Sequence, residues 1–188
     1  MKKWRRWGWA LLWACLTLVR AAPFQDGETV CFLGDSITHG GLYHSLIYDY
    51  YLTRFPERTI RFVNAGISGD TAGGALERLQ EDVLAHHPTT VVILLGMNDV
   101  GRGNYVESPD EGKRKAAQDA IERYRTRMDQ ILETLRAAGP MKIVLLTPSP
   151  YDQTVVNDRN NNQPGCNDGL GLCAEIVRSL AGKHDAEV

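Results

Sequence analysis

Apolar and polar positions along the chain follow two alternating periodicities. Short runs of apolar and β-branched residues, typical of strands, occupy residues 29–33, 59–63, 90–95 and 142–147. Apolar residues at helical spacing follow them, over residues 42–55, 71–86, 121–135 and 169–182. The third helix is expected to end at Gly139-Pro140, a strong stop signal. Its predicted buried face consists of Ile121, Tyr124, Met128, Ile131, Leu132 and Leu135.

This alternation predicts an α/β fold with one parallel sheet and helices on both of its faces. No internal repeat or interdomain linker interrupts residues 22–188, which are expected to form one domain. Ala186-Glu187-Val188 has the pattern of a fifth strand, and the sequence stops there. A doubly wound sheet has about five strands or more. We therefore expect a sandwich that is truncated before or within its fifth strand.

The first 21 residues have the pattern of a secretory signal peptide. A basic segment at residues 2–6 precedes an apolar run at residues 7–19, and small residues follow. Cleavage after Ala21 would place Val19 and Ala21 at the two positions that prefer small side chains. The mature chain is therefore expected to begin at Ala22 and to be secreted or periplasmic.

Two alternatives remain open for this leader. It could stay uncleaved as an anchor, although its apolar run is short for a membrane span. It could also be processed for lipid attachment at Cys15, although Trp13 is bulky for that signal. After cleavage at Ala21 no stable membrane span is expected.

Composition fits one globular domain: 188 residues, 43% hydrophobic and 23% charged, with a formal net charge of −2. The charge is uneven, because the leader carries five basic residues and no acidic ones. Residues 22–188 keep 16 basic residues against 23 acidic ones. A mildly acidic body without a basic cluster argues against a nucleic-acid partner. Oligomeric state is not indicated.

Three cysteines remain in residues 22–188. Cys31 lies inside an apolar run and is expected to be a small buried side chain. Cys166 and Cys173 flank a glycine-rich segment in a compartment that permits disulfides, so we expect a bridge between them. No Cys-x-x-Cys pair occurs, and no metal is expected.

Polar clusters follow the apolar runs, where ligands bind in parallel sheets. The first is Gly34-Asp35-Ser36, whose serine could be a nucleophile at a helix start or simply a helix cap. The second, at residues 64–71, contains Gly66 and Gly69, and it could bind a substrate or be only a tight loop. The third is Gly96-Met97-Asn98-Asp99, whose amide could stabilise an oxyanion or cap a turn.

Taken together, Gly-Asp-Ser-Ile-Thr, Asn-Ala-Gly-Ile-Ser-Gly-Asp-Thr and Gly-Met-Asn-Asp, in this order and spacing, resemble three sequence blocks of the SGNH (GDSL-type) hydrolases. The resemblance covers the chain from about residue 29 onward. It implies a flavodoxin-like three-layer α/β/α fold and ester hydrolysis through a serine acyl-enzyme. By motif, Ser36 corresponds to the nucleophile, and its N–H, the Gly69 N–H and the Asn98 amide correspond to the oxyanion hole. Asp35 and Asp99 are supporting residues of these blocks.

The fourth block of the family, Asp-x-x-His, is absent from these 188 residues. It supplies the general base and the aspartate that orients it. The five histidines are poor replacements: His39 and His44 follow the serine closely, His86 and His87 close a helix, and His184 lies at the opposite end of the sheet. We therefore expect the chain as given to be inactive or very slow, because triad members act as a unit.

The expected function is hydrolysis of a carboxylic ester, most simply removal of acetyl from a carbohydrate or another small polar carrier. The loops at 100–115 and 148–168 are polar, with Tyr105 and Tyr151 as their only aromatic residues. Alternatives are a non-catalytic carbohydrate-binding module, or a lysophospholipase or thioesterase of the same family. No cofactor is expected, because the glycine-rich loop lacks the ending of a phosphate loop.

Overall fold

A four-stranded parallel sheet forms the centre of the protein in the computed structural model, which describes residues 24–154 and 163–188. Its strands lie in the order β2 (Arg61–Gly66), β1 (Thr29–Gly34), β3 (Thr90–Leu94) and β4 (Lys142–Leu145). Glu187 forms a parallel bridge to Val144, so residues near the C-terminus lie beside β4, as expected of a strand opening there. The predicted leader and Cys15 lie outside the described residues.

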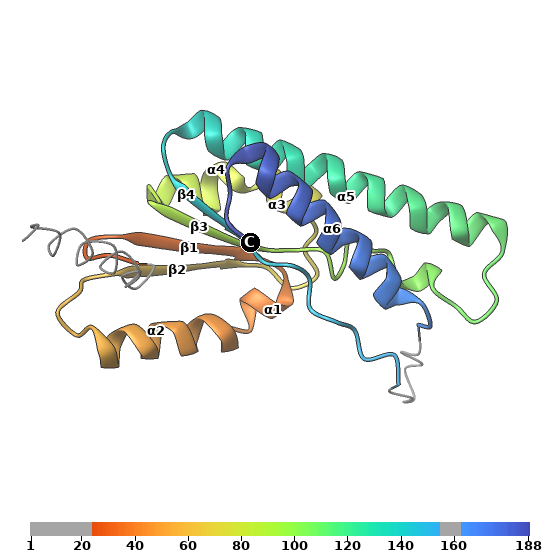
Figure 1. Cartoon of the computed structure of the whole chain (residues 1–188), viewed down its shortest axis with the longest axis horizontal. Helices are drawn as coiled ribbons and strands as arrows, with labels where there is room; N and C mark the ends of the chain where they lie inside the picture. Colours follow the sequence, from red (N-terminus) through yellow and green to blue (C-terminus); the bar gives the residue numbers. More distant parts are fainter. Residues whose placement is uncertain (1–23, 155–162) are drawn as a thin grey trace, which may run out of the picture.

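Helices lie on both faces of the sheet (Figure 1). One face is covered by α2 (Leu42–Arg54), which follows the one-turn helix α1 (Ser36–His39). The other face carries four helices, which are α3 (Ala72–Glu77), α4 (Leu79–Asp82), α5 (Glu111–Ala138) and α6 (Cys166–His184). Two 3-10 turns, η1 (Leu84–His86) and η2 (Arg102–Asn104), complete the connections. The predicted three-layer α/β fold is confirmed.

Alternate residues of the strands point into two separate cores. Cys31 and Leu33 of β1 face the large core under α3 to α6, whereas Val30 and Phe32 face the smaller core under α2. β3 is buried along its whole length because it lies in the middle of the sheet with helices on both sides. All six residues of the predicted apolar face of α5 are buried.

The helix predicted over residues 71–86 is divided into α3, α4 and η1. The division falls at Arg78, which ends α3 and precedes α4. Its side chain turns inward to Asp70 and to the Gly34 carbonyl. The break in the helical pattern thus coincides with tertiary contacts of this partly buried arginine.

The predicted bridge between Cys166 and Cys173 is wrong, because both are free thiols within α6. Seven residues along a helix separate them by about 10 Å of rise. A disulfide needs Cα atoms within about 7 Å. Both side chains are instead buried, as is Cys31, whose thiol pKa burial raises to about 12.

None of the helices within 24–154 and 163–188 combines the length and apolar character needed to cross a membrane.

Candidate active site

Three loops meet at the carboxyl edge of the sheet. The ends of β1, β2 and β3 lie in register, with Gly34 opposite both Gly66 and Leu94. The chain segments that leave these strands therefore begin at the same level, and they carry Ser36, Gly69 and Asn98 respectively. The structure thus gathers the three predicted motif residues at one edge.

Ser36 is the first residue of α1, and its side chain is exposed. Asp35, not Ser36, caps the helix, since the Asp35 carboxylate accepts a hydrogen bond from the Ile37 N–H at 2.9 Å. No described residue forms a hydrogen bond with the Ser36 hydroxyl, which leaves it free to contact a substrate. Asp35 itself is buried, and this burial raises its pKa.

The loop after β2 uses its two glycines differently. Gly69 has φ +83°, a backbone conformation that residues with a side chain rarely adopt. Gly66 permits close packing, because a Cβ there would lie 2.2 Å from the His39 backbone nitrogen. His39 also fixes this loop, as its Nδ1 accepts a hydrogen bond from the Ser68 N–H at 3.2 Å. The loop after β2 is therefore packed against α1.

The Asn98 amide has an orientation that its two neighbours determine. Its Nδ2 donates to the Asp70 carbonyl at 2.8 Å, and its Oδ1 accepts from Arg102 Nη2 at 3.4 Å. A carbonyl only accepts and a guanidinium only donates, so the reversed amide would face two mismatched partners. The donor end of Asn98 consequently lies beside the loop that carries Gly69.

Arg78 connects the first two of these loops from beneath. Its guanidinium is 2.7 Å from the Asp70 carboxylate and also reaches Asp82 and the Gly34 carbonyl. The side chains of Arg78 and Asp70 are only 14% and 9% exposed, so water weakens this ion pair little. Sequence reasoning missed Arg78. The only available signal was a basic residue eight positions after Asp70.

Asp99 links the third loop to α3. Its Oδ1 accepts a hydrogen bond from the Ala72 N–H at 2.8 Å, whereas its buried Oδ2 has no partner among the described residues. Burial raises the Asp99 pKa to about 6, although backbone N–H groups act in the opposite direction. Asp99 thus braces the site at a cost in solvation.

No histidine of the described chain is hydrogen bonded to Ser36. His44 Nε2 lies 3.0 Å from the Thr38 carbonyl, and its ring stacks on Phe32. The Nε2 atom of His184 lies 2.6 Å from the Asp129 carboxylate of α5. The Nδ1 atom of His86 lies 3.2 Å from the Arg61 guanidinium, so His184 and His86 both contact residues other than Ser36. His39, on the same helix as Ser36, has its Nδ1 3.0 Å from the Ser68 hydroxyl.

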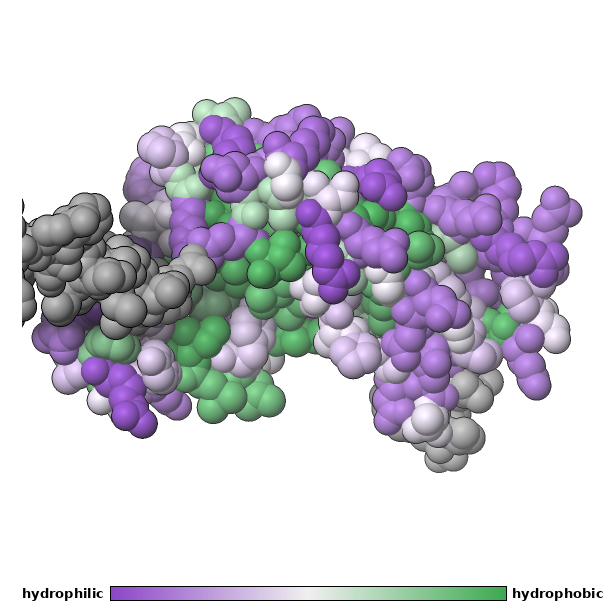
Figure 2. All heavy atoms as spheres, viewed as in Figure 1, coloured by the Kyte–Doolittle hydropathy of each residue, from purple (hydrophilic) through white to green (hydrophobic). Residues whose placement is uncertain are grey.

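The two aromatic residues of the predicted substrate loops have different positions. Tyr105 packs against the large core, where its hydroxyl lies close to Gly169 at the start of α6. Tyr151 lines a pocket of about 420 Å³ together with Asn98 and Arg102. Arg102, which the sequence analysis did not single out, lies with its guanidinium carbon 5.6 Å from the Tyr151 ring centre. The described surface around residues 148–154 is mostly polar, whereas apolar side chains gather over α2 (Figure 2).

The chain is similar in sequence to a family of lipases and acylhydrolases and to several esterases. A model described as the GDSL-like lipase/acylhydrolase family matches residues 32–188. An acetylxylan esterase of Geobacillus stearothermophilus is 37% identical over 41% of this chain and 42% of its own length. The thioesterase 1/protease 1/lysophospholipase L1 of Escherichia coli strain K12 is 33% identical over 61% of this chain and 54% of its own.

Among solved structures, a gut microbial diltiazem-metabolizing enzyme, BT4096, superimposes with a TM-score of 0.80 at 34% identity. The match covers 89% of this chain and 37% of that one. The present chain thus spans about half the length of the curated relatives it matches.

Proposed function

This chain belongs to the GDSL-like lipase/acylhydrolase family, the SGNH-type hydrolases, and from this we propose that it carries the nucleophile and oxyanion hole of a carboxylic ester hydrolase. The observation that carries the proposal is the convergence of Ser36, Gly69 and Asn98 at the ends of three adjacent parallel strands. Ester hydrolysis needs an accessible nucleophile beside hydrogen-bond donors that face the developing oxyanion.

In the proposed reaction the Ser36 oxygen bonds to the ester carbonyl carbon, the ester C–O bond breaks, and the serine proton leaves with the alcohol, so that an acyl-serine remains. The N–H groups of Ser36 and Gly69 and the Asn98 amide stabilise the oxyanion. Water then cleaves the acyl-serine, which releases the acid and restores the hydroxyl. Asp35 and Asp99 hold these groups in place through the Ile37 and Ala72 N–H groups and do not react. No step requires a metal or an organic cofactor.

The 188 residues by themselves are proposed to be a slow enzyme, because no described histidine is bonded to Ser36. Without a base the serine keeps its proton, while the oxyanion donors remain. Ser36 should therefore react slowly even with activated reagents and turn over ordinary esters poorly. Imidazole added to the solution could act as the missing base, because Ser36 is exposed.

We propose a small acyl group, such as acetyl, on a polar carrier as the substrate. The pocket beside Asn98 is lined by Arg102, Asn104 and Gln163, which suits a hydroxylated carrier and not a long hydrocarbon chain. The acetylxylan esterase named above supports the same choice.

For residues 1–21 we propose removal during export, so that the mature chain starts at Ala22. The mass of the secreted protein would test this cleavage.

The test is Ser36-dependent reaction of the 188-residue chain. With imidazole present as a base, a fluorophosphonate should label Ser36 in the wild type, and no label should appear in Ser36→Ala. p-Nitrophenyl acetate should be hydrolysed slowly and faster with imidazole, and p-nitrophenyl octanoate should be a poorer substrate. Equal labelling of Ser36→Ala would refute the nucleophile. Fast turnover without imidazole would refute the proposal that the 188 residues lack a base for Ser36. A preference for octanoate would favour the lysophospholipase or thioesterase alternative.

A further inference from the structure

The pocket next to Asn98 contains an arginine with unused hydrogen-bonding capacity. The Arg102 guanidinium makes one hydrogen bond to the described residues, at 3.4 Å to Asn98 Oδ1, and lies over the Tyr151 ring. A guanidinium has five N–H donors. No carboxylate of the described residues forms an ion pair with Arg102, whereas Arg78 nearby is paired with both Asp70 and Asp82. With respect to the described residues, four donors of this permanent cation are therefore unused, in a pocket of about 420 Å³.

The same pocket offers an unused acceptor. Gln163 Oε1 is buried and has no partner within the described residues. A buried acceptor without a hydrogen bond destabilises the fold, so a ligand that supplies a hydroxyl donor would relieve this cost. Gln163 lines the pocket with Arg102, and the Asn104 amide adds further polar groups. The pocket thus combines a cation with an acceptor for a hydroxyl group.

Asn98 is common to this pocket and to the proposed oxyanion hole. A ligand held by Arg102 would therefore lie next to the reacting ester and be part of the same substrate. Of the planar anions, a carboxylate matches the two parallel N–H groups of an arginine best.

We propose that this pocket binds a carboxylate-bearing, hydroxylated carrier, of which a uronic acid is the simplest example, with the carboxylate on Arg102 and a hydroxyl on Gln163. The inference rests on the proposed esterase function and narrows its substrate to esters of acidic sugars. Arg102 has a binding role here, besides its contact with the Asn98 amide.

The experiment measures binding, so it does not depend on turnover. The probes are galacturonate as its methyl glycoside with a free carboxylate, neutral methyl galactoside and galactose 6-phosphate, titrated into the 188-residue chain at low ionic strength. The galacturonate glycoside should bind at least about tenfold more tightly than methyl galactoside. Arg102→Gln should weaken galacturonate binding at least about tenfold and change galactoside binding less than about twofold. Arg102→Lys should fall between, because it keeps the charge and loses the fork.

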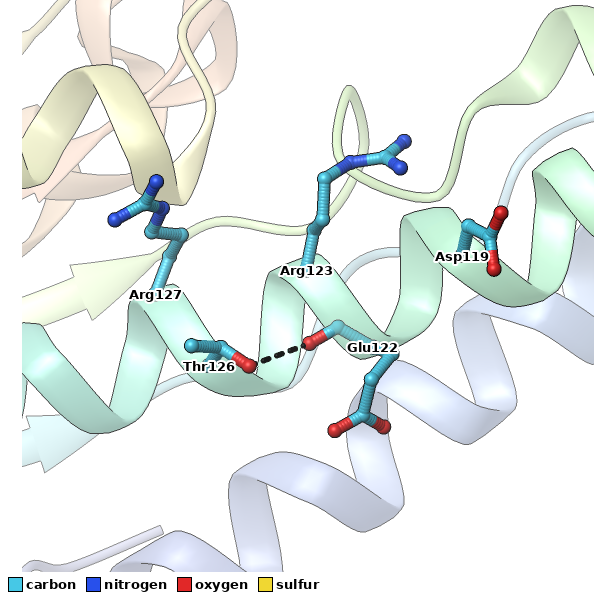
Figure 3. A pocket seen from close by; sticks show the side chains of 5 residues that line it. All are labelled: Asp119, Glu122, Arg123, Thr126 and Arg127. Atoms are coloured by element: carbon cyan, nitrogen blue, oxygen red, sulfur yellow. Dashed lines mark hydrogen bonds between the residues drawn. The ribbon is translucent and has the colours of Figure 1, made fainter.

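Arg123→Gln is the matched control. Arg123 is an exposed arginine on α5 that lies in a separate surface groove with Asp119 and Arg127 (Figure 3). The Arg123→Gln substitution removes the same charge from the protein and should leave galacturonate binding unchanged. Equal binding of galacturonate and galactoside to the wild type would overturn the proposal, as would equal effects of the two arginine variants. Tighter binding of galactose 6-phosphate than of galacturonate would overturn the choice of a carboxylate.

Fluorophosphonate labelling separates this inference from the function on which it rests. With imidazole present, galacturonate should slow the labelling of Ser36 in the wild type and not in Arg102→Gln. Labelling that galacturonate does not slow would refute the pocket and leave the hydrolase proposal standing. Binding that depends on Arg102 in a chain whose Ser36 cannot be labelled would refute the hydrolase and leave the pocket standing.

Discussion

Single side chains at the strand ends have more than one task. Asn98 tethers the Asp70 carbonyl while its amide is proposed to stabilise an oxyanion. Asp99 holds α3 by its Ala72 contact and has a second oxygen buried without a partner. Each residue can therefore be probed with two readouts, one for stability and one for chemistry.

Replacing Asn98 should affect chemistry much more than folding. Asn98→Ala removes the proposed amide donor, so Ser36-dependent p-nitrophenyl acetate hydrolysis in imidazole should fall about 10²- to 10³-fold. Loss of the tie to Asp70 should lower the free energy of unfolding by only about 1 kcal/mol. Asn98→Asp, which lies beside Arg102, serves as the control for side-chain size. Unchanged hydrolysis in both variants would exclude Asn98 from the oxyanion hole.

Asp99 should make stability depend on pH. Burial raises its folded-state pKa from 3.8 to about 6, so the folded protein binds the proton more tightly than the unfolded chain does. The resulting stability is fully present below about pH 4 and is lost as the pH rises through about 6, by an amount on the order of 3 kcal/mol.

Asp99→Asn tests this dependence in urea denaturation at pH 4.5 and pH 7.5. The side chain of the variant cannot ionise, so the variant should be more stable relative to the wild type at pH 7.5 than at pH 4.5. Constant effects of the amide cancel in this difference. The same relative stability at both pH values would show that Asp99 does not titrate as expected.

At the scale of elements, the sequence predicts most reliably where local pattern and tertiary packing agree. The buried face of α5 follows from helical periodicity alone, and all its members are buried. The break at Arg78 and the cysteine positions were mispredicted because they depend on long-range contacts and on how far α6 extends. α6 begins at Cys166, not at residue 169, and this places both cysteines in one helix.

Ser36, Gly69 and Asn98 could be recognised from the sequence because each belongs to a motif that follows the end of a predicted strand. Arg78 and Arg102 could not, since nothing in the sequence states which loop an arginine will reach. The orphan oxygen of Asp99 is likewise a property of the packed site, and only the folded chain reveals it.

Arg78 should be the main structural link between the loops of the site. Arg78→Gln leaves Asp70 without its ion-pair partner, so the free energy of unfolding should fall by about 2–3 kcal/mol. Fluorophosphonate labelling of Ser36 should also slow, because the loop with Gly69 loses its support. Arg125→Gln, which breaks an exposed pair with Glu122, is the control and should cost less than about 0.5 kcal/mol. A cost for Arg78→Gln no larger than that of the control would contradict the bracing role.

At the scale of the whole molecule, the two faces of the sheet are covered unequally. Four helices lie over the large core, and α2 covers the smaller one (Figure 1). Large apolar side chains that remain exposed gather on α2, where they are Leu42, Leu46, Tyr48, Tyr50 and Leu52. Leu42, Leu46 and Tyr50 follow one another at spacings of four residues and form an apolar stripe on one side of α2.

This apolar area should bind hydrophobic dyes in the native state. Leu42 and Leu46 are 76% and 63% exposed and lie one turn apart, so a double change to Gln should remove much of the fluorescence gained by anilinonaphthalene sulfonate. Stability should change by less than about 0.5 kcal/mol per site, because exposed side chains add little to the core. Leu172→Gln is the matched control, since Leu172 is 50% exposed on α6, apart from the others. Dye fluorescence that persists in the double variant would mean that the apolar face of α2 is not the surface that binds the dye.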